Sequence, residues 1–314
     1  NGKMNHAYLF YGPEKVGKTA TAKLFAKSVL CENSKGNGPV PCDECSTCRQ
    51  FEKGTYADLY WLERATDEKT GERKDVIIVE QVRDLIDRIS KRAFLNNYKI
   101  VIIPEAQFMN AGASNCLLKT LEEPTVKTII ILIGPSKSSF LPTIVSRCQS
   151  LQFLPVNRDA IYDSLVSDGV NRSAARELAA AALGRPTIAK KFLAEPETWQ
   201  KFQTDAKELV TVLSLDAAGK FKWVDSLIKK GLADDEVIAK LDSLERVSRD
   251  ILLAGNRNQG EASNLLIENE ISSATNNFSV NQLTGFVRRI EKTKRFIRQN
   301  VNVRFALENL LLNI

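Results

Sequence analysis

The feature that most constrains this chain is the segment Gly12–Thr19, Gly-Pro-Glu-Lys-Val-Gly-Lys-Thr, which fits the pattern G-x-x-x-x-G-K-[S/T]. The run His6–Tyr11 before it is short, aromatic and aliphatic, as is typical of a buried strand. The residues after Lys18 are good helix formers without glycine or proline. A strand, a glycine loop and a helix in this order wrap the phosphates of a nucleotide, because the N–H groups and the dipole at the helix start favour an anion.

Four residues of this segment are the expected nucleotide contacts. Gly12 and Gly17 are the glycines of the phosphate loop. Lys18 is expected to meet the terminal phosphates, and Thr19 is expected to hold Mg²⁺. The lone histidine, His6, is interpreted as a packed strand residue rather than a catalyst.

Four cysteines follow the helix that the loop opens. Cys31 stands near its expected end, and Cys42, Cys45 and Cys48 complete a C-x10-C-x2-C-x2-C pattern. This ligand count and close pairing are what tetrahedral zinc requires. Since four protein ligands leave no position open for catalysis, we expect a structural metal that staples the loop 31–48; four reduced thiols without metal are the alternative.

Composition limits the class of protein. A net charge of +6, with 43% apolar and 26% charged residues, is ordinary for a globular protein, and 314 residues suffice for two or three domains. No apolar run approaches a membrane span and no signal-peptide pattern opens the sequence, so we expect a cytoplasmic protein without membrane contact. In that setting cysteines favour metal binding over disulfides, and the separate Cys116 and Cys148 are interpreted as packed thiols.

Further apolar runs predict a parallel sheet. Lys99–Ile103 and Thr128–Ile133 are continuous enough for central strands. A helical pattern over Val79–Ile89 precedes the first of them, and a helix capped by Asn110 and stopped at Pro124 joins the two. Strands that alternate with helices indicate an α/β module with a parallel sheet.

The strand Lys99–Ile103 leads into the position where phosphate-loop ATPases carry two acids, one for the metal and one for its water. Here the sequence reads Pro104-Glu105. Glu105 remains available to polarise water, as a remnant of a catalytic acid. Pro104 has no side-chain oxygen, so the carboxylate that supports magnesium is missing. The sequence therefore predicts that ATP with Mg²⁺ can bind but is hydrolysed poorly.

Arg147 lies in the segment Leu141–Cys148, after the second central strand. An arginine on a short segment at a domain edge can reach a phosphate on a neighbouring subunit, where it stabilises the charge that develops during phosphoryl transfer. A surface arginine in an ion pair is an equally good interpretation of the pattern alone.

Beyond Pro155 the composition shifts to helix formers. Three short helices and then longer amphipathic segments are expected, over residues 157–169, 171–183, 187–194, 206–215, 222–230, 234–253 and 279–312, with polar breaks at 255–260 and 272–277. The last segment holds a basic cluster, namely Arg288, Arg289, Lys292, Lys294, Arg295 and Arg298. The cluster could attract DNA, but a solvated helix face explains it equally well, and we favour that interpretation.

Several stretches resemble the clamp-loader family of bacterial DNA polymerase III, which belongs to the AAA+ ATPases. They are residues 6–10, the phosphate loop, the four cysteines, 115–124 (Asn-Cys-Leu-Leu-Lys-Thr-Leu-Glu-Glu-Pro), 141–148 (Leu-Pro-Thr-Ile-Val-Ser-Arg-Cys) and 300–311. The resemblance implies a nucleotide-binding AAA+ module at 1–155 with an inserted zinc module at 31–48. It further implies an all-α lid at 156–204 and an all-α collar for oligomerisation at 205–314.

The resemblance also implies partners. The chain would join gamma/tau-type and delta-type subunits in a hetero-pentamer, and through this complex it would act on the sliding clamp and primer-template DNA during replication. Arg147 would be the arginine finger that it offers to the ATP of a neighbouring subunit.

Departures from the active members of the family decide between subunit types. Besides Pro104, the segment Gly134–Ser136 offers no Thr or Asn to sense the γ-phosphate, and Thr187 stands where motor subunits carry a sensing arginine. These differences favour a stator with little or no ATPase activity of its own. The main alternative is an active gamma/tau-type ATPase subunit. A third is a DNA-binding zinc protein with a vestigial nucleotide fold, although no base-reading motif is evident.

Overall fold

The computed structural model describes residues 4–35, 38–67, 71, 73–91, 93, 98–125, 127–255, 263–264 and 267–314. The chain divides into two compact units, Asn1–Pro155 and Val156–Ile314. None of the helices formed by the described residues has the length and apolar character needed to cross a bilayer.

The first unit contains a parallel sheet in the strand order β2-β3-β4-β1-β5. Its strands are β1 (Ala7–Tyr11), β2 (Leu59–Trp61), β3 (Lys99–Ile103), β4 (Thr128–Gly134) and β5 (Gln149–Gln152). The three expected strands are confirmed as β1, β3 and β4. The sequence analysis missed β2 and β5, the two edge strands, because one is only three residues long and the other is largely polar.

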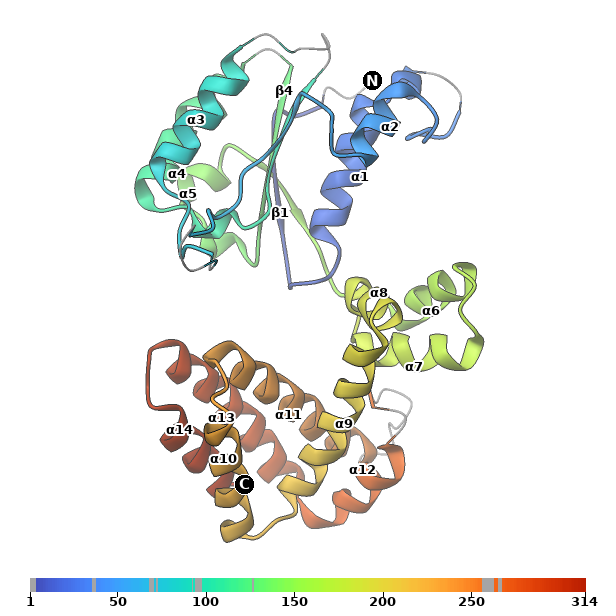
Figure 1. Ribbon diagram of the computed structural model, residues 1–314, viewed down its shortest axis with the longest axis vertical. Coiled ribbons are helices and arrows are strands. Elements are labelled where there is room, and N and C mark those ends of the chain that lie inside the picture. Colours follow the sequence, from blue (N-terminus) through green and yellow to red (C-terminus); the bar gives the residue numbers. More distant parts are fainter. Residues whose placement is uncertain are drawn as a thin grey trace. The chain divides into compact units, whose positions relative to one another are not determined.

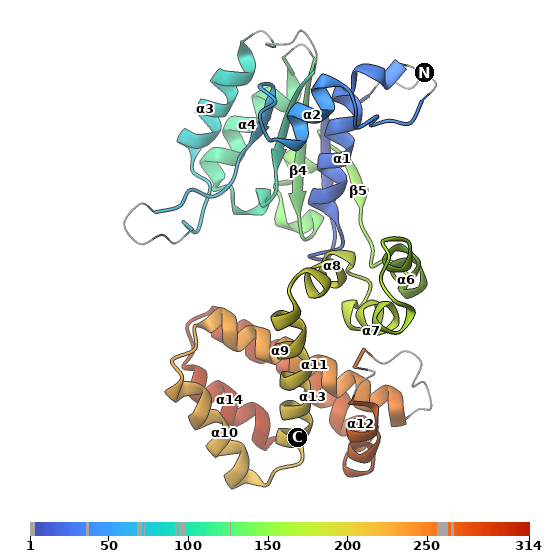
Figure 2. The same cartoon turned by 45° about the vertical axis from the view of Figure 1, so that its right-hand side comes forward.

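Helices cover both faces of this sheet (Figures 1 and 2). One face carries α1 (Lys18–Leu30) and α2 (Ser46–Glu52), and the other carries α3 (Val79–Ser90), α4 (Ala111–Glu122) and α5 (Pro142–Val145). Short 3-10 turns lie at Glu32–Lys35, Ala106–Phe108 and Lys137–Ser139. Along β4 the buried side chains alternate between the two faces, as a strand covered on both sides requires.

Caps and stops that the sequence predicts are present in this unit. The side chain of Asn110 accepts a hydrogen bond from the N–H of Ala113 at 2.8 Å and so caps α4. His6, interpreted as a packed strand residue, instead lies directly before β1 and is half-buried; its Nε2 lies 2.8 Å from the carbonyl oxygen of Leu121.

The second unit is helical throughout its described residues. Its elements are α6 (Arg158–Ser167), α7 (Arg172–Ala182), α8 (Pro186–Ala194), α9 (Pro196–Leu213), α10 (Ala217–Lys229), α11 (Asp234–Gly255), α12 (Glu268–Ala274), a 3-10 turn at Thr275–Asn277, α13 (Val280–Arg298) and α14 (Val303–Leu312). The three short helices are confirmed as α6 to α8. The polar stretch 272–277, expected to be a break, is instead helical, and the other expected break, 255–260, lies outside the described residues except at Gly255.

Two of the longer segments also differ from expectation. The segment 279–312 forms two helices, because Asn300 adopts a positive φ of 61° that ends the first of them. Helix α9 begins at Pro196, ten residues before the expected start at 206, because Trp199 and Phe202 pack with Phe192 of α8 in an aromatic group. The expected boundary between lid and collar, at 204 and 205, therefore falls inside α9.

One member of the basic cluster on α13 is not solvated. The side chain of Lys294 is buried, and its Nζ lies 2.9 Å from Asp242 Oδ1, 2.7 Å from Glu245 Oε2 and 2.5 Å from Glu291 Oε1. The first two acids come from α11 and Lys294 lies on α13, so the ammonium links these two helices of the second unit. The hydrogen bond from Lys294 lowers the pKa of the Glu291 carboxyl. The expectation of a solvated face is therefore wrong for Lys294.

Replacement of Lys294 by methionine is expected to lower the free energy of unfolding at pH 7 by about 2 kcal/mol, because three carboxylates lose their common cation. Because the folded pKa of Glu291 lies below its ordinary value, the stabilisation is present above that value and is lost as the pH falls through the folded pKa. Urea unfolding followed by circular dichroism should therefore show a smaller difference from wild type at pH 3 than at pH 7. Arg288→Met, at an exposed position of the same helix, is the control and should have little effect.

Candidate functional site

The phosphate loop has a backbone that requires glycine at two positions. Gly12, directly after β1, has φ 145°, and a Cβ there would lie 2.1 Å from the carbonyl oxygen of Phe153. Gly17, at the N-cap of α1, has φ 102°, and a Cβ there would meet no atom within 4 Å. Gly12 therefore allows a close packing of backbone on backbone, whereas Gly17 leaves open space at the start of the helix.

The start of α1 suits an anion. Gly17 provides no side-chain cap, and the first turn carries no acidic residue. Within the described part of the chain, the structure gives no acceptor for the backbone N–H groups of Lys18 and Thr19. Uncapped N–H groups at the positive end of a helix dipole are what a phosphate needs, so these residues fit a nucleotide.

The ammonium of Lys18 is held by the loop itself. Its Nζ donates to the carbonyl oxygens of Gly12 at 2.5 Å and Pro13 at 2.6 Å. The side chain is buried, and this burial lowers its pKa while the nearby Glu14 opposes the effect. The cation lies beside the loop backbone, within the segment predicted to surround phosphate, and Thr19 follows it in the first turn of α1.

Glu105, the expected water-polarising acid, is held by two arginines. Its carboxylate accepts hydrogen bonds from Arg64 Nε at 3.2 Å and Nη2 at 3.3 Å, and from Arg73 Nη1 at 3.4 Å. The guanidinium of Arg64 also lies over the ring of Phe108, at 4.2 Å from its centroid. The expectation that Glu105 is available to polarise water does not fit these contacts, because its charge is already paired.

Sequence reasoning missed Arg64 and its role. The residue follows β2 by three positions, and β2 pairs with β3, which leads to Glu105. The parallel pairing of these two strands places the ends of both at the same edge of the sheet. The signal would have been an arginine soon after a short aromatic strand, but that strand was itself not recognised.

Arg147 lies near the amino-terminal edge of the sheet, just before β5. Its Nη1 donates to the Thr143 carbonyl at 2.9 Å and to Ser146 Oγ at 3.4 Å, and its Nη2 forms an ion pair with Glu122 at the end of α4. About one third of the side chain is exposed. The structure therefore places this arginine partly at the surface, in contact with three acceptors.

The register of the sheet separates Arg147 from the phosphate loop of its own chain. In the parallel pair of β1 and β5, Tyr8 lies opposite Gln149, and Tyr11 lies opposite Gln152. The loop begins after Tyr11, whereas Arg147 precedes Gln149. The intervening strand is five residues long, which at about 3.3 Å per residue corresponds to about 16 Å. Arg147 and the loop thus belong to opposite edges of the sheet.

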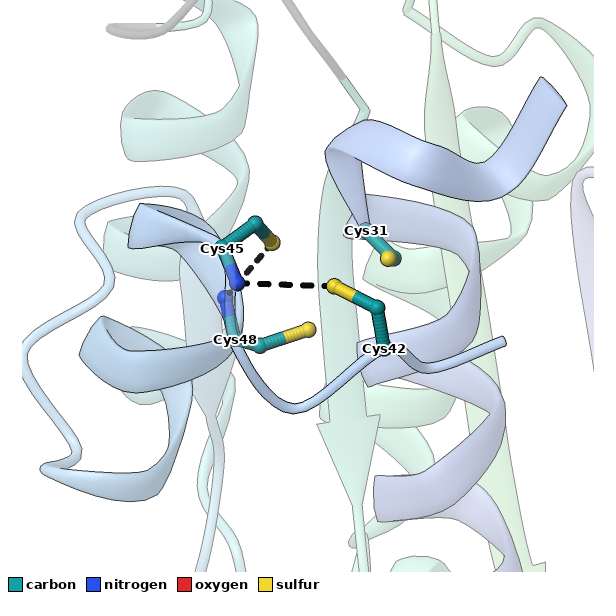
Figure 3. A group of neighbouring side chains, drawn as sticks. All are labelled: Cys31, Cys42, Cys45 and Cys48. Atoms are coloured by element: carbon teal, nitrogen blue, oxygen red, sulfur yellow. Dashed lines mark hydrogen bonds between the residues drawn. The ribbon is translucent and has the colours of Figure 1, made fainter. Parts of the chain in front are cut away.

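The four predicted metal ligands come together (Figure 3). Cys31 follows the end of α1, Cys42 and Cys45 lie in the loop before α2, and Cys48 lies in α2. Their sulfur atoms are all within 4.8 Å of one another. Tetrahedral coordination at a metal–sulfur distance of about 2.3 Å places sulfurs about 3.8 Å apart, so this group could bind one metal ion.

Backbone N–H groups support the thiols. The N–H of Cys45 donates to Cys42 Sγ, and the N–H of Cys48 donates to Cys45 Sγ, each at 3.4 Å. Hydrogen bonds from the N–H groups of Glu44 and Cys45 lower the pKa of the Cys42 thiol to about 6, whereas burial raises the pKa of Cys48 to about 12. Cys42 is therefore the ligand that the backbone best prepares as a thiolate.

Polar contacts that sequence reasoning did not foresee connect the two helices of the cysteine module. Buried Lys27 of α1 lies 2.6 Å from Asp43 and also pairs with Glu52 of α2, and these partners raise its pKa. Glu32, after α1, accepts hydrogen bonds from the N–H of Thr47 at 3.2 Å and from its hydroxyl at 2.9 Å. The module is thus braced by charges from both helices. The two remaining cysteines pack as expected: Cys148 is buried, which raises its pKa to about 12, and Cys116 is half-buried.

Comparisons with known proteins agree with these features. A family model described as DNA polymerase III, delta subunit, matches residues 1–157, half of the chain. The delta′ subunit of Bacillus subtilis strain 168 is 28% identical over 317 residues, which cover 99% of this chain and 91% of that protein. The delta′ subunit of Pseudomonas aeruginosa PAO1 is 42% identical over 143 residues, covering 46% of this chain and 41% of that protein.

A tau subunit matches about half of the chain. The tau subunit of B. subtilis strain 168 is 38% identical over 161 residues, which cover 51% of this chain and 26% of that protein. The matched region thus spans less than half of the length of the Pseudomonas and tau relatives, but nearly all of the Bacillus delta′ subunit. The chain therefore belongs to the DNA polymerase III delta-subunit family and is of the delta′ type.

Proposed function

We propose that this chain is a stator subunit of a bacterial clamp loader, the hetero-pentamer that places the sliding clamp on primed DNA. In this role it joins gamma/tau-type and delta-type subunits, and it supplies Arg147 as an arginine finger to the ATP of its neighbour. The observation that carries the proposal is the position of Arg147, exposed at the edge of the sheet opposite the phosphate loop of its own chain. From there a guanidinium serves a phosphate of another subunit, not its own.

The phosphate loop of the chain binds ATP with Mg²⁺ without efficient hydrolysis. Gly12, Gly17 and Lys18 hold the phosphates, and Thr19 holds the magnesium ion. Bound nucleotide would supply a counter-charge for the start of α1 and would order the loop. Two features support poor hydrolysis: Pro104 provides no metal ligand, and Glu105 is paired with two arginines.

The alternative is an active gamma/tau-type ATPase. It is favoured by the intact phosphate loop and by the tau match over about half of the chain. The stator is favoured by the delta′ match over 99% of the chain and by the paired state of Glu105. Brisk ATP hydrolysis by the isolated chain would support the motor.

We also infer that the metal of the four cysteines is zinc and that its role is structural. Four thiolates saturate a tetrahedral ion and leave no site for water or substrate. The contacts of Lys27 and Glu32 hold the same two helices that the ion would join.

The first prediction of the proposed function concerns the ATPase activity of the complex. Reconstitution with a gamma/tau-type subunit, a delta-type subunit, clamp and primed DNA should show that Arg147→Ala lowers the steady-state ATPase rate about tenfold or more, since an arginine finger contributes roughly 10³ to 10⁵ at its own site. Lys18→Ala should reduce the rate far less, because the loop that it impairs is not a site of turnover. A rate that falls with Lys18→Ala but not with Arg147→Ala would support the motor instead.

The second prediction concerns the metal. Purified chain is expected to contain about one zinc ion, measured by plasma mass spectrometry, and chelation should lower the melting temperature. Cys45→Ser should lose the metal, whereas Cys116→Ser, at a half-buried thiol outside the group, should retain it. Lys27→Met should keep the metal but lower the melting temperature, because Asp43 and Glu52 lose their cation. A stable, metal-free wild-type protein would contradict the structural role.

A further inference from the structure

Two of the three guanidinium nitrogens of Arg147, Nη1 and Nη2, have acceptors among the described residues. Nη1 donates to the Thr143 carbonyl and to Ser146 Oγ, and Nη2 pairs with the carboxylate of Glu122. A guanidinium has five N–H donors. Nε has no acceptor among the described residues, so this donor is free to bind an anion. Guanidinium N–H groups form charge-assisted hydrogen bonds to phosphate oxygens.

Glu122 lies on a part of the backbone that is fixed by contacts on both sides. It is the last residue of α4, and the preceding Leu121 is fully buried, with its carbonyl oxygen 2.8 Å from His6 Nε2 at the start of β1. The N–H of the following Glu123 is bound to the carbonyl of Lys119 at 2.9 Å. The backbone on both sides of Glu122 is therefore fixed to the sheet and to its own helix.

A mobile arginine must give up rotamer freedom when it binds a ligand, and this loss of side-chain entropy weakens binding. Contacts already present in the free subunit remove part of that cost, because the guanidinium plane is oriented before the neighbouring nucleotide arrives. Thr143 and Ser146 lie within four residues of Arg147 on the same turn, so they cannot fix its direction relative to the sheet. Only Glu122, 25 residues away in sequence, ties the guanidinium to a separate element.

We propose that Glu122 is a positioning residue for Arg147: it fixes the guanidinium on α4 and leaves Nε free for a phosphate of the neighbouring subunit. The proposal rests on the function proposed above. Two other roles for the pair give different results in the experiment below. A surface ion pair without a functional role would contribute little to stability or to activity. In a latch, by contrast, the ion pair with Glu122 would hold Arg147 away from the phosphate and would have to break before Arg147 could act. The free Nε favours positioning, because the guanidinium can bind the carboxylate through Nη2 and a phosphate oxygen through Nε at the same time.

The test is the clamp- and DNA-stimulated ATPase activity of the reconstituted complex, with four variants of this subunit: Arg147→Ala, Glu122→Ala, Glu122→Gln and the double variant Arg147→Ala/Glu122→Ala. Glu122→Ala is expected to lower kcat about tenfold while KM for ATP changes less than about twofold, since misplacement of a catalytic group affects the chemical step. Glu122→Gln should restore kcat to within about twofold of wild type, because its amide oxygen still accepts from Nη2. In the Arg147→Ala background, Glu122→Ala should have no further effect.

Glu123→Ala is the matched control, since Glu123 is adjacent and exposed and forms no ion pair among the described residues. Assembly of each variant into the complex, measured by size-exclusion chromatography, and its melting temperature would show whether the fold is intact. Unchanged kcat in Glu122→Ala would overturn the positioning role, and a raised kcat would show a latch. An additive loss in the double variant would show that Glu122 acts independently of Arg147. If Arg147→Ala itself has no effect, the proposed function fails together with this inference, whereas a loss in Arg147→Ala alone overturns only the inference.

Discussion

The parallel pairing of β1 with β5 is the constraint on which the arrangement of this protein depends. It places the phosphate loop at one edge of the sheet, where Gly12 packs on the backbone of Phe153, and Arg147 at the other. Because the separation is set by backbone hydrogen bonds, no side-chain rearrangement within the unit can bring the two together. The phosphate-loop motif and the Arg147 guanidinium therefore cannot meet within one chain. This separation is consistent with the proposal that Arg147 acts on a neighbouring subunit.

In the proposed function, the phosphate loop binds nucleotide without hydrolysing it efficiently. The start of α1 offers uncapped N–H groups and a buried ammonium, which are features that suit a phosphate. Hydrolysis needs in addition a free carboxylate beside the metal and water. Here Pro104 has none to offer, and Glu105 is bound by Arg64 and Arg73. The carboxylate therefore accepts three hydrogen bonds from two guanidinium groups, which supports the proposal that hydrolysis is poor.

The sequence was sufficient for features whose cause is local. The phosphate loop, the cap at Asn110 and the cysteine spacing each depend on residues close together in the chain, and the structure contains the cap and brings the cysteines together. It was insufficient where two distant segments meet. The pairing of Arg64 with Glu105 requires β2, which is too short to show a pattern, and the burial of Lys294 requires acids some 50 residues away. The pattern of basic residues around Lys294 does not indicate that its side chain is buried.

Helix α1 connects the phosphate-loop motif to the four-cysteine motif. Its first turn forms the end of the phosphate loop, and its last turn leads into the cysteine group. Lys27, one turn before that end, is buried and joined to both the loop and α2 of the cysteine module. A metal at the four thiols would therefore stiffen the carboxyl end of the same helix whose amino end forms the phosphate-loop motif. In the proposed stator, a helix held at both ends would keep the phosphate loop in a fixed position relative to the cysteine module, which is a physical reason for the two motifs to occur together.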